Sequence, residues 1–291
     1  MGAYMEKGQL FANLGYFCKM KSVYSLLTNA ESESFGLIAG PCAAESRDLL
    51  MHIAHDLKEI TSQLGIPLVF KASYKKANRT KLDSFTGVGD EKALSWLQEV
   101  SKQFDIPVIT DIHSAAEASL AAEFVDVLQI PAFLFRQTEL LVAAAKTGKV
   151  VNIKKGQFAG PTAMKHAANK VLESGNELIW LTERGSFFGY NDLVVDFRSI
   201  PIMKSLGYPV IMDVTHSLQQ PNQSSGVTGG LPHLIGAMGN AAMSVGANGI
   251  FMETHPEPSK ALSDGANMLP LNQVQKLLTQ WKRIYLAAKG S

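Results

Sequence analysis

Residues 36–42 read GLIAGPC, a short apolar run that ends in a Gly-Pro pair and a cysteine. A run that is apolar on both faces is typical of a parallel strand buried on both sides. The next segment, Ser46–Gln63, carries apolar side chains at intervals of three and four residues, which predicts a helix. The stretch therefore reads as the first strand and helix of an α/β fold.

The same pairing of strand and helix recurs along the chain. The predicted strands are Gly36–Ala39, Pro67–Lys71, Pro107–Asp111, Val125–Ile130, Val150–Lys154, Leu178–Thr182, Pro209–Asp213 and Gly249–Glu253. The predicted helices are Ser46–Gln63, Glu91–Phe104, Ala115–Phe124, Glu139–Thr147, Thr162–Ser174, Phe197–Leu206, Pro232–Val245 and Asn272–Ala288. Glycines stand where left-handed C-terminal caps are expected after the helices, at Gly65, Gly148, Gly175, Gly207 and Gly246.

Eight such pairs in about 250 residues predict a TIM (β/α)8 barrel. We place the barrel at residues 36–291, preceded by an extension, residues 1–35, that forms an arm or hairpin and could cover the bottom of the barrel. A doubly wound open sheet is the alternative, because the number of strands does not by itself establish closure.

The composition excludes several classes of protein. The 291 residues carry 27 basic and 26 acidic side chains, so no global charge favours nucleic acid or anionic lipid. No stretch approaches the roughly 20 apolar residues that span a membrane, and residues 1–21 lack the apolar core of a signal peptide. Two cysteines cannot build a disulfide framework, so we expect a cytoplasmic protein with free or metal-bound thiols.

Nearly every predicted strand ends in a polar or ionisable residue. In a TIM barrel these ends form the catalytic face. They carry Cys42, Lys71, Asp111, His113, Gln129, Lys154, Lys155, Glu183, Arg184, Asp213, His216, Glu253 and His255. Lys71, Lys154, Arg184 and the loop of residues 75–79 make a cationic mouth, which favours a substrate with two or more anionic groups. A desolvated Lys71 that forms a Schiff base is a second, less favoured reading.

A divalent metal site is the second hypothesis for these strand ends. Cys42, His216, Glu253 and Asp264 offer a thiolate, an imidazole and two carboxylates, which together suit a divalent ion. The spacing leaves alternatives open. Cys42 could be an ordinary buried thiol, His113 and His255 also follow strands, and Asp264 lies in a Ser-Asp-Gly turn.

Five motifs carry a resemblance to a known family. They are residues 70–80 (FKASYKKANRT), 128–138 (LQIPAFLFRQT), 152–158 (NIKKGQF), 183–185 (ERG) and 213–219 (DVTHSLQ). Together they resemble the 3-deoxy-D-manno-octulosonate 8-phosphate synthase family. The resemblance implies a TIM barrel, assembled as a homotetramer. It also implies condensation of phosphoenolpyruvate with D-arabinose 5-phosphate and water, with release of inorganic phosphate, in lipopolysaccharide biosynthesis.

The resemblance also implies roles for individual residues. Those expected to hold phosphoenolpyruvate are Lys71, Lys76, Lys154 and Arg184, with Ser73, Gln129 and His216 close by. Asn78, Arg79 and Thr80 would hold the sugar phosphate, and Thr80 replaces a serine that is frequent in the family. Arg136 would reach the site of a neighbouring subunit. Lys76, His216 and Asp264 are the expected catalytic residues.

Cys42 decides between two branches of that family. Members with cysteine after Gly-Pro require a metal, whereas members with asparagine do not. The sequence Ser263-Asp264-Gly265-Ala266 also departs from the Cys-Asp-Gly-Pro of the metal-free branch. The resemblance therefore implies a metal held by Cys42, His216, Glu253 and Asp264, and His113 and His255 drop out. Zn, Fe(II), Mn and Co all remain candidates, and no organic cofactor is expected.

Two other functions compete with this one. The related synthase that uses erythrose 4-phosphate shares the Gly-Pro-Cys start, but it carries a Lys-Pro-Arg-Thr type of loop where this chain has residues 76–80. A non-catalytic barrel that only binds a partner is the third reading, and the full set of polar strand ends argues against it.

Overall fold

Eight parallel strands close into a ring in the computed structural model, which describes residues 15–28, 33–78, 84–187, 192–220 and 229–290. In order around the ring they are β1 (Gly36–Gly40), β2 (Leu68–Lys71), β3 (Val108–Asp111), β4 (Val127–Ile130), β5 (Val150–Lys154), β6 (Ile179–Glu183), β9 (Val210–Asp213) and β12 (Gly249–His255). Strand β1 pairs in parallel with β12, from Gly36 opposite Gly249 to Gly40 opposite Glu253, and this pairing closes the sheet. The TIM barrel is confirmed, and the open-sheet alternative is wrong.

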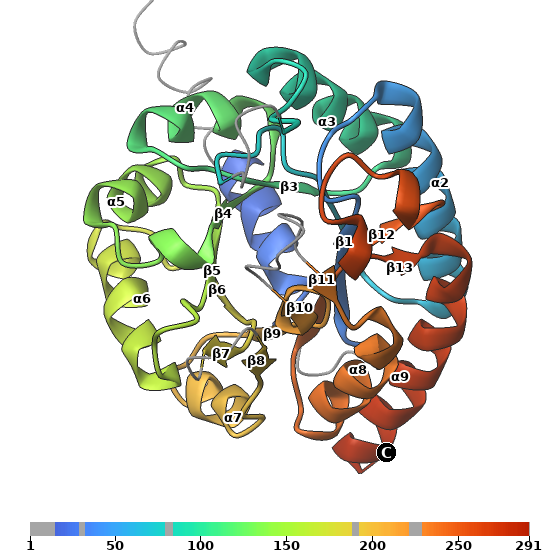
Figure 1. The fold of residues 1–291 in the computed structure, drawn as a ribbon. Helices are drawn as coiled ribbons and strands as arrows, with labels where there is room; N and C mark the ends of the chain where they lie inside the picture. The colour runs from blue at the N-terminus through green and yellow to red at the C-terminus, as the bar shows by residue number, and fades with distance from the viewer. Residues whose placement is uncertain (1–14, 29–32, 79–83, 188–191, 221–228, 291) are drawn as a thin grey trace, which may run out of the picture.

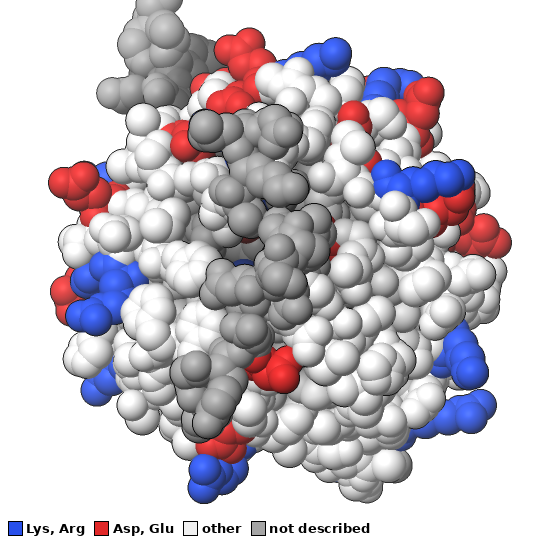
Figure 2. All heavy atoms as spheres, viewed as in Figure 1, with Lys and Arg blue, Asp and Glu red and all other residues white. Residues whose placement is uncertain are grey.

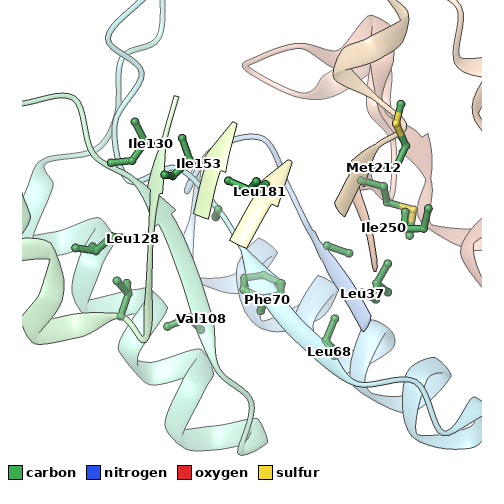
Figure 3. Packing of buried hydrophobic residues seen from close by; sticks show 14 of the residues in the cluster. Leu37, Leu68, Phe70, Val108, Leu128, Ile130, Ile153, Leu181, Met212 and Ile250 are labelled. Carbon is green, nitrogen blue, oxygen red and sulfur yellow. The ribbon is translucent and has the colours of Figure 1, made fainter. Parts of the chain in front are cut away.

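The predicted helices form the outer layer around these strands (Figure 1). Their bounds are α2 (Arg47–Leu64), α3 (Asp90–Phe104), α4 (Ala115–Phe124), α5 (Thr138–Lys146), α6 (Met164–Glu173), α7 (Ser199–Lys204), α8 (Ile235–Ser244) and α9 (Val274–Lys289). All five predicted cap glycines have positive φ, between 61° and 91°. Strand side chains such as Leu68, Phe70 and Val108 face these helices and build the larger hydrophobic core (Figure 3).

Shorter elements lie in the loops at the carboxyl end of the barrel, and hydrophobic periodicity does not predict them. The short strands are β7 (Ser186–Phe187), β8 (Leu193–Val194), β10 (Gln219–Gln220), β11 (Gly229–Gly230) and β13 (Leu269–Pro270). The 3-10 turns are η1 (Ala132–Leu134), η2 (Pro161–Ala163), η3 (His216–Leu218), η4 (Pro232–Leu234), η5 (Pro258–Lys260), η6 (Gly265–Asn267) and η7 (Leu271–Gln273).

Within the extension before β1, residues 15–25 form a helix, which occupies the centre of the ring in Figure 1. Its buried side chains Met20 and Val23, with Leu27 just beyond the helix, pack against the inward-facing strand residues of the second hydrophobic core. Lys19 Nζ also lies 2.7 Å from Asp126 Oδ1. The helix therefore closes the amino end of the barrel. In the described part of the chain, no helix is long and apolar enough to cross a membrane.

Candidate active site

A cavity of about 960 Å³ lies at the carboxyl ends of the strands. The predicted site residues that line it are Lys71, Lys76, Asn78, Gln129, Lys154, Arg184, His216 and Asp264, and Asp111 and His113 from the list of strand ends line it as well. On the face viewed in Figure 2, most visible charged side chains lie near the edge of the molecule. The lysines of the cavity are buried, unlike these surface charges: the Lys71 side chain is only 1% exposed and the Lys154 side chain only 6%.

Cys42 reaches this site because of the Gly-Pro turn before it. A Cβ atom on Gly40 would lie 2.0 Å from the carbonyl oxygen of Lys71, so only glycine allows β1 to pass β2 this closely. The turn brings the fully buried Cys42 Sγ to 3.2 Å from Asp264 Oδ2 and 3.2 Å from Ser263 Oγ. The two segments that meet here are more than 200 residues apart in the sequence.

Three of the four predicted metal ligands form a compact cluster. The ligand atoms of Cys42, Glu253 and Asp264 all lie within 4.8 Å of one another. One sulfur and two carboxylate oxygens at such separations fit a single divalent ion. Burial, with the nearby Glu253 carboxylate, raises the pKa of the Cys42 thiol well above its usual value. A bound cation would reverse this balance, since a coordinating thiol is deprotonated.

The fourth predicted ligand, His216, borders the cluster. Its Nδ1 lies 2.8 Å from Asp213 Oδ2, and its Nε2 lies 3.5 Å from Glu253 Oε1. A carboxylate on Nδ1 favours the proton at that nitrogen and leaves the Nε2 lone pair toward the cluster. Asp213 is itself fully buried. In many metal sites a carboxylate holds a metal-binding histidine by its second ring nitrogen, and Asp213 is that carboxylate for His216.

Lys71 forms a buried ion pair beside the cluster. Its Nζ lies 2.8 Å from Glu253 Oε1 and donates to the carbonyl oxygen of Cys42 at 3.2 Å. Burial opposes ionisation of Glu253, but Lys71 and His216 outweigh it and lower the pKa of Glu253 to about 2. Burial likewise opposes the charge on Lys71, yet Glu253 raises the pKa of Lys71 above its ordinary value. This lysine is a fixed cation, which does not favour the Schiff-base reading.

Lys154 and Arg184 supply two more buried cations to the cavity. Lys154 Nζ lies 2.6 Å from Asp213 Oδ2, and Arg184 Nη2 donates to Gln219 Oε1 at 2.8 Å. Burial lowers the pKa of both side chains. Arg184 Nη1 is buried and has no hydrogen-bond partner among the described residues. A buried unpaired guanidinium nitrogen beside a cavity is suited to an anionic ligand.

Asp111 is the residue to which the sequence assigns no role and the structure gives a central position. Ser73 Oγ and Gln129 Nε2 both donate to its carboxylate, and Lys71 Nζ lies 3.7 Å away. Although burial opposes ionisation, Lys71 and Lys76 hold the pKa of Asp111 far below its usual range. A sequence signal exists, because Asp111 and Asp213 are acidic residues in apolar strands.

The remaining predicted residues are distributed differently. Asn78 lies at the exposed rim of the cavity, while Arg79 and Thr80 lie outside the described residues. Arg136 is exposed and does not line the cavity of its own chain. His113 lies 3.2 Å from Glu117, and His255 Nδ1 accepts the backbone N–H of Glu257, so neither joins the metal cluster.

Comparison with known proteins confirms the family resemblance that the sequence motifs indicate. A family model described as the DAHP synthetase I family matches residues 26–288. The chain is 50% identical over 264 residues to a protein of Brucella anthropi, covering 91% of this chain and 95% of that protein. It is 52% identical over 254 residues to a protein of Agrobacterium fabrum, covering 87% of this chain and 90% of that protein. Both relatives are named 2-dehydro-3-deoxyphosphooctonate aldolase.

Proposed function

The chain belongs to the DAHP synthetase I family, and we propose that it condenses phosphoenolpyruvate with D-arabinose 5-phosphate and water. The products are 3-deoxy-D-manno-octulosonate 8-phosphate, a precursor of lipopolysaccharide, and inorganic phosphate. The names of the relatives support this reaction over condensation with erythrose 4-phosphate or a non-catalytic role. The observation that carries it is a cavity lined by the buried cations Lys71, Lys154 and Arg184 and by Asp264, which belongs to the cluster of metal-binding groups.

Phosphoenolpyruvate is the substrate for the cations that line the cavity. Lys71, Lys76, Lys154 and Arg184 bind its phosphate and carboxylate, with Ser73, Gln129 and His216 at the same end of the barrel. The support is electrostatic, because buried and desolvated cations bind a small multivalent anion far more strongly than exposed ones. The unpaired Nη1 of Arg184 offers one such contact directly.

Arabinose 5-phosphate binds nearer the rim in this proposal. Asn78 lies there, and the proposal assigns the sugar phosphate to Asn78 together with Arg79 and Thr80. Arg136 is exposed and does not line the cavity of its own chain, which leaves it accessible to a neighbouring subunit of a homotetramer. Each active site would then be completed by a second chain.

Cys42, Glu253 and Asp264, with His216 as the fourth ligand, hold a divalent ion, for which Zn, Fe(II), Mn and Co are candidates. When bound, such an ion supplies a positive charge that polarises or orients an oxygen of the reacting groups. The mixed sulfur, nitrogen and oxygen ligands do not choose between these metals.

The chain's own residues orient the substrates and move protons. C3 of phosphoenolpyruvate attacks the aldehyde carbon, water adds at C2, and phosphate leaves by C–O cleavage. Lys71, Lys154 and Arg184 fix the anionic groups in line for this attack, and such orientation can supply about 7–11 kcal/mol. Lys76 carries protons to or from the reacting oxygens, which is general acid–base catalysis, and His216 and Asp264 contribute to catalysis as ligands of the ion.

The test is an assay of purified protein with phosphoenolpyruvate and each of two sugars. We expect release of phosphate and formation of an eight-carbon product with arabinose 5-phosphate, and at most slow turnover with erythrose 4-phosphate. Elemental analysis before and after chelation, with activity followed on adding back each metal, tests the ion. Equal or preferred use of erythrose 4-phosphate would contradict the substrate assignment. Full activity after complete metal removal would contradict the proposed requirement for a divalent ion.

A further inference from the structure

Four buried polar side chains form a continuous belt of hydrogen bonds inside the barrel, from the wall of the cavity to strand β6. The belt consists of Thr182, Asn152, Gln129 and Asp111, on the adjacent strands β6, β5, β4 and β3. Thr182 Oγ1 donates to Asn152 Oδ1 at 2.7 Å, and Asn152 Nδ2 donates to Gln129 Oε1 at 2.8 Å. Gln129 Nε2 then donates to Asp111 Oδ1. Strand register explains the contact, because Asp111 pairs with Gln129 and Gln129 pairs with Asn152.

The charge of Asp111 fixes the direction of every bond in the belt. An ionised carboxylate only accepts, so the end of Gln129 that faces it must be the amide nitrogen. The oxygen of Gln129 then faces Asn152, which must present its own nitrogen. That leaves the Asn152 oxygen toward Thr182, whose hydroxyl must donate. Each amide therefore has one allowed orientation, and the hydroxyl of Thr182 completes the chain.

Asn152 and Thr182 differ from Gln129 and Asp111 in their access to substrate. Gln129 and Asp111 line the cavity. Asn152 and Thr182 do not line it and are both 0% exposed. Polar groups are costly to bury, and the inward-facing residues one layer below are apolar. Packing alone would be served equally well by valine and leucine at these two positions.

We infer that Asn152 and Thr182 are positioning residues that hold the Gln129 amide, and through it Asp111, in the orientation that binds phosphoenolpyruvate. With its nitrogen turned to Asp111, Gln129 keeps that carboxylate in place between Ser73 and Lys71. The inference rests on the proposed function and deepens it, because it adds to the phosphoenolpyruvate site two buried residues that do not touch the ligand.

Two substitutions at Thr182 separate this role from packing. Thr182→Val keeps the shape and removes the hydroxyl donor, whereas Thr182→Ser keeps the donor and removes a methyl group. We expect Thr182→Val to weaken phosphoenolpyruvate binding about tenfold, the order of one lost hydrogen bond in a buried network. We expect Thr182→Ser to bind within about twofold of wild type. A packing role predicts the reverse order, with serine the more damaging change.

The measurement is the dissociation constant of phosphoenolpyruvate by calorimetry, with the KM for arabinose 5-phosphate and the thermal midpoint as parallel readouts. A positioning role changes the phosphoenolpyruvate constant and leaves the KM of the sugar within about twofold. If phosphoenolpyruvate affinity, the KM for the sugar and the thermal midpoint all worsen together, the inference is overturned. Wild-type protein that does not bind phosphoenolpyruvate would contradict the proposed function instead, so the two failures are distinguishable.

A double-variant cycle tests whether Thr182 acts through Asn152. Asn152→Leu removes the donor to Gln129 and keeps the number and branching of the side-chain heavy atoms, and we expect at least a tenfold weaker phosphoenolpyruvate constant. In that background Thr182→Val should add no further loss, because the link it supports is already gone. Additive losses of phosphoenolpyruvate affinity in the double variant would show that Thr182 does not act through Asn152. That result would overturn the inferred series of hydrogen bonds.

Discussion

Two layers of side chains inside the same barrel differ by only two residues along each strand. The pairs from the lower to the upper layer are Val69 and Lys71, Ile109 and Asp111, Val127 and Gln129, Trp180 and Thr182, Ile211 and Asp213, and Phe251 and Glu253. Residues two apart on a strand face the same side, roughly 6.5 Å from one another. Within that one step the barrel interior changes from apolar to polar and charged.

The two layers have opposite energetic characters. The lower layer continues into Met20 and Val23 of the amino-end helix and is an ordinary hydrophobic core. The upper layer buries Lys71, Asp213 and Glu253, and buried ion pairs contribute little net stability because desolvation offsets their attraction. Stability should therefore depend mainly on the lower layer, while ligand binding and catalysis depend on the upper one.

Replacing one buried lysine at each end gives the largest expected contrast. Lys71→Met should lower kcat/KM about a thousandfold, comparable to removing a group that stabilises charge at a reacting centre. Lys149→Met, at the amino end just before β5, should keep kcat/KM within about twofold, because Lys149 Nζ lies over the Tyr16 ring at 5.1 Å, at the opposite end of the barrel from the cavity. Steady-state kinetics on both variants measure the contrast. Equal losses would show that the two ends are not functionally separate.

The two cysteines also lie at opposite ends. Cys42→Ala should lower the affinity for the divalent metal more than about 100-fold, since partners that merely hydrogen-bond a ligand contribute 10–100-fold. Cys18→Ala, on the exposed side of the amino-end helix, is the matched control and should keep the wild-type metal content. Competition titration with a chromophoric chelator measures both. Unchanged affinity in the Cys42 variant would remove the thiol from the metal site.

The sequence predicts the barrel and the position of Cys42 because both depend on local patterns. Apolar runs and cap glycines mark each strand and helix, and the Gly-Pro pair marks the turn before Cys42. The spacing of Met20, Val23 and Leu27 indicates a helix in the same way, and the prediction of an arm or hairpin for residues 1–35 leaves that signal unused.

Contacts across the barrel could not be predicted from local patterns. Asp111 acts as the partner of Ser73, Gln129 and Lys71 only because strand register brings three strands level. Asn152 carries a motif signal for the family but no signal for its hydrogen bonds. The roles assigned to Arg79 and Thr80 stay predictions, since these residues lie outside the described part of the chain.

A small cavity in the lower layer should lower the stability of the protein without changing its catalysis. The lysine and cysteine substitutions of the upper layer act instead on catalysis and metal binding. Val23→Ala should lower the free energy of unfolding by about 2 kcal/mol, from two lost carbon atoms and the space they leave. That corresponds to roughly 3–4 °C in thermal midpoint for a chain of this size. The kcat of the folded enzyme should not change. Scanning calorimetry and kinetics below the transition test this, and a large loss of kcat would show that the two layers are coupled.

The smallest expected effect concerns Glu117, near the cavity end of the barrel. Burial opposes its ionisation, but hydrogen bonds from Tyr74 and from the backbone and ring of His113 lower the pKa of Glu117 to about 2. A depressed folded-state pKa stabilises the protein above the ordinary value of 4.5, and this contribution is lost as the pH falls from about 4.5 toward 2. Glu117→Gln should therefore be less stable than wild type at pH 7, by less than about 1 kcal/mol because the site is partly open to solvent.

The difference in thermal midpoint between wild type and Glu117→Gln should shrink below pH 4.5. The exposed Glu91→Gln on α3 reports what removing one acidic charge does by itself. A gap between wild type and Glu117→Gln that stays constant down to pH 3 would mean that the cavity end contributes no acid sensitivity through this residue.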